Sequence, residues 1–136
     1  MIEKFENYKK VNEIPNKKQP WAFAAVSQGF DEEKKTFSYI IGDVVTSLEE
    51  IPHGLIPFEI PAIKYAVFPI RPKNRFAWGK AIANIKKYAY TEWLPNSKYE
   101  LSKIIDDVEY HDERSLRKEN PESDLYVAIK EKTRTK

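Results

Sequence analysis

Glu109 and His111 stand two residues apart in a short segment, Val108–His111, whose composition is typical of a β-strand. Alternation along a strand would place Glu109 and His111 on one face, and Val108 and Tyr110 on the other. A carboxylate in the middle of a strand is notable, because Glu is mostly found exposed. Glu109 is therefore either an ordinary solvated or ion-paired residue or the buried charge of a binding site.

The second interpretation has a direct physical basis. A carboxylate removed from water has a raised pKa and a charge without a partner. A lipophilic cation would supply the counter-charge, and surrounding aromatic rings would each add about 0.5–2 kcal/mol of cation–π attraction. Aromatic residues make up 13% of the chain, although core packing is the simplest explanation of any single ring. His111 would make ligand capture depend on pH, but a rim or solvent-exposed histidine is the simpler interpretation.

Other chemistries find little support in the sequence. The two histidines, His53 and His111, are far apart and cysteine is absent, so no zinc-ligand set is expected. Glycine-rich phosphate loops, nucleophile elbows and kinase motifs are also missing, and we expect neither a metal nor a cofactor. The acidic pairs Asp106-Asp107 and Asp112-Glu113 are expected in turns, as solvated charge. No helix-turn-helix pattern is seen, so a DNA-binding part of that kind is not expected.

Bulk composition limits the remaining classes of protein. A chain of 136 residues, 41% of them hydrophobic, is expected to form a single domain over residues 1–136. A net charge of +2 argues against direct nucleic-acid binding. No apolar run approaches the ~18 residues of a membrane span, and the N-terminus lacks a secretory signal. These observations predict a soluble cytoplasmic protein.

Two amphipathic segments are expected to form helices, Ile2–Val11 and the longer Phe76–Leu94. In the longer segment the expected solvent-exposed face carries Lys80, Asn84 and Lys87. Its apolar stripe consists of Trp78, Ala81, Ile82, Ile85 and Ala89.

Alternating apolar residues predict a series of strands. We expect them at Trp21–Gln28, Thr36–Ile41, Phe58–Ile60, Ile63–Ile70, Tyr99–Leu101, Val108–His111 and Asp124–Glu131. The second is expected to continue through Val44–Thr46 past a bulge at Gly42. In the last, Leu125, Val127 and Ile129 should share one face.

The order of several short motifs resembles the GyrI-like family, which includes the effector-binding domains of AraC- and MerR-type regulators. The clearest motif is Trp-Leu-Pro-x-Ser-x-Tyr-Glu-Leu at residues 93–101, followed by the Glu109 strand and then Asp112-Glu113-Arg114. No single piece is specific, but their order and spacing are, and they cover most of the chain beyond about Phe37. Further matches lie at residues 37–42, 60–62, 65–68 and 123–129.

This resemblance implies an α+β fold made of two duplicated helix-plus-strands halves. The halves would share a mainly antiparallel sheet, with two helices on one face and a ligand groove between them. Family members usually carry a strand before the first helix, and here that strand is apparently absent. The first half is therefore either incomplete, giving a wider pocket, or borrows an edge strand from a second copy in a homodimer.

The resemblance also selects site residues. Glu109 aligns with the acidic residue that family members use to meet cationic ligands. Tyr39 and Trp93 are the implied pocket walls, and His111 stands where many members carry a tyrosine. Phe23, Phe68 and Tyr126 are further candidates for the pocket.

The function implied is a stand-alone small-molecule-binding protein of the effector or multidrug-sensing type, taking aromatic or cationic amphiphiles. One alternative is a hydrolase of reactive electrophiles, in which Glu109 with Tyr39 or Tyr126 would serve as a general base; no catalytic residue is assigned. A second alternative is a protein-binding module similar to the gyrase-inhibiting member of the family. The solvent exposure of Glu109 would separate these alternatives from a site-free domain, because a buried Glu109 ringed by aromatic residues favours sensing or catalysis.

Overall fold

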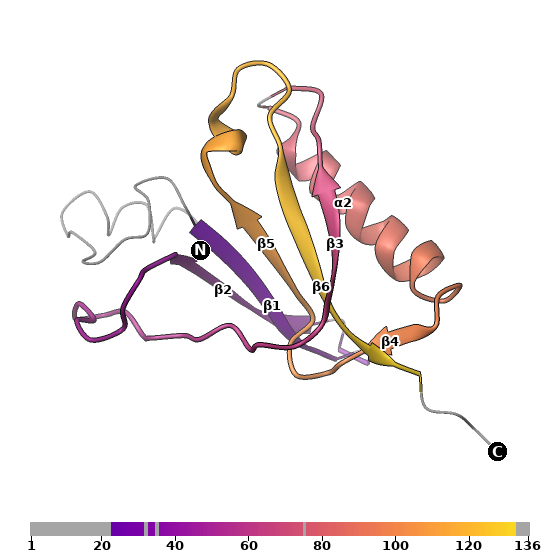
Figure 1. The fold of residues 1–136 in the computed structure, drawn as a ribbon, viewed down its shortest axis with the longest axis horizontal. Coiled ribbons are helices and arrows are strands. Elements are labelled where there is room, and N and C mark those ends of the chain that lie inside the picture. The colour runs from indigo at the N-terminus through magenta and orange to yellow at the C-terminus, as the bar shows by residue number, and fades with distance from the viewer. Residues whose placement is uncertain (1–22, 32, 35, 75, 133–136) are drawn as a thin grey trace.

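The computed structural model describes residues 23–31, 33–34, 36–74 and 76–132. These residues form an α+β fold in which every strand pairing is antiparallel. The main sheet has the order β2-β1-β5-β6-β3, and β4 pairs with the far end of β6. Figure 1 shows these strands side by side, with α2 running alongside β3 and β6. The predicted α+β class and antiparallel sheet are confirmed.

Each strand follows from an alternating segment of the sequence. The strands are β1 (Phe23–Asp31), β2 (Thr36–Asp43), β3 (Tyr65–Ile70), β4 (Tyr99–Leu101), β5 (Asp107–His111) and β6 (Ser123–Glu131). Leu125, Val127 and Ile129 lie buried on one face of β6, as their alternation predicted.

Two strand predictions are wrong. Phe58–Ile60 forms no strand and belongs to the long connection between β2 and β3. The expected bulge at Gly42 is also absent, because Gly42 pairs regularly with Ala24. The irregularity lies on the partner strand instead, between Gln28 and Asp31, where Gly29 takes a φ of +66°. That left-handed conformation is easily reached only without a Cβ, so glycine suits the bulge.

The long amphipathic segment forms a single 16-residue helix in two parts. An α-helix, α2 (Trp78–Tyr88), continues into a π-helical turn, η1 (Ala89–Trp93). The π turn is closed by Leu94 N–H, which donates to the Ala89 carbonyl at 2.9 Å, and the helix ends before Pro95, which cannot continue it. The predicted apolar stripe packs against β3 and β6, around a core of Phe68, Ile70, Ala89, Leu125, Val127 and Ile129.

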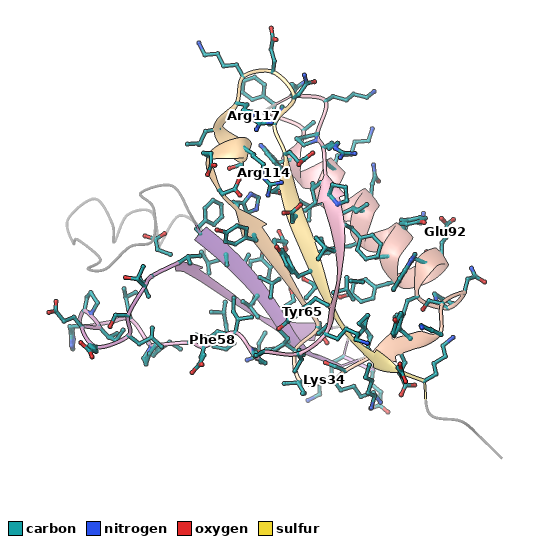
Figure 2. The ribbon with its side chains drawn as sticks, viewed as in Figure 1. Lys34, Phe58, Tyr65, Glu92, Arg114 and Arg117 are labelled. Atoms are coloured by element: carbon teal, nitrogen blue, oxygen red, sulfur yellow. The ribbon has the colours of Figure 1, made fainter. Side chains whose placement is uncertain are left out.

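The opposite face of the sheet is covered by the connection between β2 and β3. Phe58 and Ile63 from this connection pack on a second core, in which Ala24, Val26 and Val108 are buried. Figure 2 shows Phe58 along the connection and Tyr65 where it enters β3. The sheet thus has one face toward α2 and one toward the connection, and the two sets of side chains on β5 lie in different environments.

Two predictions fall on parts of the chain that are not described. The first helix, Ile2–Val11, lies outside the described residues, as does Trp21 at the start of the first predicted strand. A second helix and a duplication of the fold are therefore not shown. Among the described residues, no helix is long and apolar enough to cross a membrane.

Candidate functional site

Three polar side chains, Asp107, Glu109 and His111, point from β5 toward the face that carries α2. All three are buried, and Glu109 is only 3% exposed. The register places Glu109 opposite Ala25 on β1 and opposite Leu125 on β6. Small and apolar neighbours on both sides leave these carboxylates shielded from water, so each needs a polar partner from above the sheet or from farther along it.

Glu109 finds two such partners at one oxygen. Tyr39 on β2 donates its hydroxyl to Glu109 Oε2 at 3.1 Å. Lys86 on α2 places its ammonium nitrogen 2.9 Å from the same oxygen. Oε1 receives no hydrogen bond from the residues that the structure describes. The carboxylate is therefore paired and hydrogen-bonded, and the expected charge without a partner is not what the structure contains.

Asp107 forms the second half of the cluster. The Tyr90 hydroxyl donates to Asp107 Oδ2 at 2.5 Å, a short bond typical of a charged acceptor. Lys86 Nζ lies 3.3 Å from Asp107 Oδ1, but Oδ1 accepts no hydrogen bond of acceptable geometry in the described part of the chain. The expectation that Asp107 is a solvated turn residue is wrong, because β5 begins at this residue and turns its side chain inward.

Burial and charge together shift the pKa values in this cluster, which is defined by Tyr39, Lys86, Tyr90, Asp107 and Glu109. Burial raises the pKa of Asp107, and Lys86 and Tyr90 offset this only in part. Burial lowers the pKa of Lys86, but the two carboxylates outweigh it and the pKa stays above its ordinary value. Burial and the neighbouring carboxylates raise the pKa of both tyrosines far above 10. The tyrosines are therefore neutral donors and Lys86 is a cation at neutral pH.

His111 sits among aromatic rings at the end of β5. Its imidazole stacks on Phe23 and meets the edge of Trp78, with ring centroids 5.4 Å apart. The prediction of a rim or solvent histidine is wrong, because His111 is 7% exposed. Burial lowers its pKa to about 4, and the charge of Asp112 opposes this shift only weakly. At neutral pH His111 is thus an uncharged aromatic surface beside the carboxylates.

Comparison with known families gives one match. A family model described as Cass2, integron-associated effector binding protein, matches residues 1–129. The chain belongs to the Cass2 family. Cass2 is a GyrI-like effector-binding domain, so the resemblance seen in the sequence is confirmed over the whole chain. No curated protein matches the chain.

The structure brings together four of the seven residues that the resemblance selected for this Cass2-family protein. Tyr39 and Glu109 are hydrogen-bonded, and Phe23 and His111 are stacked on the neighbouring strands β1 and β5. All four side chains belong to the face of the sheet that carries α2.

The other three candidates make their described contacts elsewhere. Trp93, in η1, meets the edge of Phe68 with ring centroids 5.3 Å apart and stacks on Tyr99 at 6.2 Å. Both Phe68 and Trp93 pack in the core between the helix and β3. Tyr126 pairs with Val108 on β5 and so points to the face opposite Glu109, where it contacts Tyr65 and Tyr110.

Sequence reasoning missed Lys86, Tyr90 and Asp107. Signals for all three are present in the sequence. Lys86 follows Ile82 by four residues, which places it on the apolar stripe, and Tyr90 follows Lys86 by the same spacing. Asp107 precedes Glu109 by two residues and so shares its strand face. A lysine and an aspartate on otherwise buried faces are a sign of an internal ion pair.

Glu109 does not line either of two cavities that lie between described residues. One, of about 530 Å³, lies at the helix end beside Tyr88, Glu92, Trp93, Asn96 and Ser97. The other, of about 420 Å³, lies between α2 and the end of β3. No group of three or more His, Cys, Asp or Glu side chains within the described ranges is arranged to hold a metal ion.

Proposed function

We propose that this Cass2-family protein captures aromatic or cationic amphiphiles at Glu109. Effector binding follows from the family, and the observation that carries the finer proposal is the burial of Glu109 beside aromatic rings. A carboxylate that is 3% exposed keeps its charge only with positive or donating partners. A lipophilic cation is such a partner, and it brings apolar surface that suits the rings.

The charge balance of the cluster supports a cationic ligand. Asp107 and Glu109 contribute two carboxylates, while Lys86 is the cation that pairs with both. When both carboxylates are ionised, one negative charge is left over in a site with little water. A ligand cation would neutralise that charge, and Oε1 of Glu109 would be the oxygen left to receive it.

The aromatic part of the ligand would be recognised by ring faces and edges next to the carboxylates. Phe23, His111 and Trp78 form a continuous contact from β1 through β5 to α2. Since His111 is neutral at neutral pH, it adds no repulsion against a cation. Stacking on such rings depends little on the ligand's charge. Neutral aromatic compounds would therefore also bind, but with lower affinity than cationic ones.

A titration with two fluorescent dyes of nearly equal shape tests this proposal. N-methylacridinium carries a fixed positive charge, and acridine is neutral at mildly alkaline pH. Glu109→Gln keeps the size and hydrogen-bonding capacity of the side chain but removes its charge. We expect the variant to lose about 1.5–3 kcal/mol of affinity for N-methylacridinium, the range for hydrogen bonds to charged groups, and little affinity for acridine.

The matched control is Glu119→Gln, which makes the same charge change at an exposed residue of the connection between β5 and β6. It should leave both affinities unchanged, since exposed charges are screened by solvent. If wild type and Glu109→Gln bind N-methylacridinium equally well, the cation is recognised elsewhere and Glu109 is a structural residue.

A further inference from the structure

Lys86 occupies the position that a ligand cation would need. Its ammonium reaches from α2 to Glu109 Oε2 at 2.9 Å, and the side chain of Glu109 is 5% exposed. The lysine side chain itself is 24% exposed, so it is shielded by protein along most of its length but is not sealed in. A ligand approaching Glu109 therefore meets an internal cation already in place.

Asp107 provides a second place for the same ammonium. It lies two residues before Glu109 on the same strand face, and its Oδ1 is 3.3 Å from Lys86 Nζ. That oxygen is buried and accepts no hydrogen bond within the described residues, while Tyr90 holds the other oxygen at 2.5 Å. A small rotation of the lysine side chain would thus complete a hydrogen bond that is not made in this structure.

We propose that Lys86 is a displaceable counter-ion, which a cationic ligand replaces at Glu109 while the lysine ammonium transfers to Asp107. The proposal rests on the proposed function, because it assumes that the ligand cation binds at Glu109. It gives each carboxylate one cation in the bound state, whereas in this structure the two carboxylates share Lys86. Every charge then has a partner in the bound state, which matters because an uncompensated buried charge is costly.

Displacement makes Lys86 a determinant of specificity. A cation must break the Lys86–Glu109 pair before it binds, so only ligands that also gain from stacking on Phe23, His111 and Trp78 compensate for that loss. Neutral aromatic ligands do not compete with Lys86 and are unaffected by it. The lysine therefore sets how strongly the site discriminates between simple cations and aromatic ones.

Four variants of the full chain, titrated with N-methylacridinium and acridine, test the exchange. Lys86→Met removes the competing ammonium and should raise the affinity for N-methylacridinium by about tenfold or more, a coupling of the size seen between contacting groups. Lys87→Met, at the exposed neighbouring position of α2, makes the same change in net charge and should alter neither affinity. Acridine binding should be equal in all of these proteins.

Asp107→Asn separates exchange from simple attraction between charges. If the ammonium moves to Asp107, this variant should weaken N-methylacridinium binding by about tenfold in the wild-type background, but by less than about twofold in the Lys86→Met background. Equal losses in both backgrounds would mean that Asp107 acts only by its charge, and would overturn the exchange.

Two further results decide the proposal. If Lys86→Met binds N-methylacridinium no more tightly than wild type while Glu109→Gln still loses affinity, the exchange is wrong and the proposed function stands. If Glu109→Gln loses no affinity, the proposed function fails and the exchange with it. Circular dichroism should show that each variant is folded. If Lys86→Met does not fold, Lys86→Gln replaces it, with the same expected gain in affinity for N-methylacridinium and the same result overturning the proposal.

Discussion

The imidazole of His111 on β5 stacks on the ring of Phe23 on β1, with centroids 4.5 Å apart and ring planes 8° from parallel. Such a stack tolerates a neutral imidazole well, whereas protonation would place a charge in an almost dry environment. The pKa of His111 is accordingly lowered by burial to about 4. Folding is therefore coupled to the protonation of this one side chain.

The pH dependence of stability should show this coupling. In the unfolded chain a histidine protonates near its ordinary pKa of 6.5, and in the folded protein near 4, so the unfolded state binds more protons between these values. The contribution of His111 is fully present above pH 6.5 and is lost as the pH falls toward 4. The full loss is about 3 kcal/mol at 1.36 kcal/mol per pKa unit, and urea denaturation at a series of pH values measures it.

The two histidines supply a matched pair of variants for this experiment. His111→Phe keeps an aromatic ring beside Phe23 but cannot titrate, so its free energy of unfolding should fall less than that of the wild type over this range. His53→Gln changes the exposed histidine of a loop and should follow the wild-type curve. Parallel curves for His111→Phe and wild type would contradict the buried neutral imidazole.

The hydrogen bond from Tyr90 to Asp107 should contribute measurably to stability. Tyr90→Phe removes the donor and leaves a buried carboxylate oxygen without its bond of 2.5 Å, which costs about 1–3 kcal/mol. Tyr88→Phe is the control, because Tyr88 is an exposed residue two positions earlier in the same helix, and surface changes are usually within about 0.5 kcal/mol. Chemical denaturation of the two variants measures this difference. Equal stabilities would mean that the hydrogen bond from Tyr90 to Asp107 does not stabilise the fold.

Local periodicity was enough to predict most of the fold. Period-two alternation located the strands around Glu109 and Leu125, and helical spacing located the stripe from Trp78 to Ala89. Phe58–Ile60 was misassigned because three apolar-rich residues before a proline also suit a loop that packs on a sheet, as Phe58 does. Sheet order was beyond local reasoning, since it depends on contacts between distant segments.

The candidate site was predicted only in part, for a related reason. The burial of Glu109 could be anticipated from its place in the strand and from the family resemblance. Its pairing with Lys86 could not, because the two residues are brought together by the packing of α2 on β3 and β6 and not by any sequence spacing. His111 was placed in solvent because its aromatic neighbours, Phe23 and Trp78, come from elements far away in the chain.

Arg114 ties together the connection between β5 and β6. Replacing it should lower the free energy of unfolding by more than replacing an ordinary surface charge does. Arg114 Nε lies 2.9 Å from Asp112 Oδ1, Nη1 lies 2.8 Å from Glu122 Oε2, and Nη2 lies 2.7 Å from Asp124 Oδ2. Asp112 also accepts the Arg114 backbone N–H and so caps the short 3₁₀ helix η2 (Glu113–Leu116). Figure 2 shows Arg114 at this turn.

Arg114→Lys tests whether the planar guanidinium, and not the charge alone, organises this turn. One ammonium cannot satisfy three carboxylates on different sides, so we expect a loss of about 1–3 kcal/mol in the free energy of unfolding. Arg71→Lys is the matched control: Arg71 also pairs with Glu122, at 2.7 Å, but its side chain is 71% exposed, and exposed pairs are worth about 0–1 kcal/mol. Urea denaturation gives both values, and hydrogen exchange should be faster for the η2 amides in Arg114→Lys alone. Equal losses in the two variants would show that the fork geometry of Arg114 contributes nothing beyond its charge.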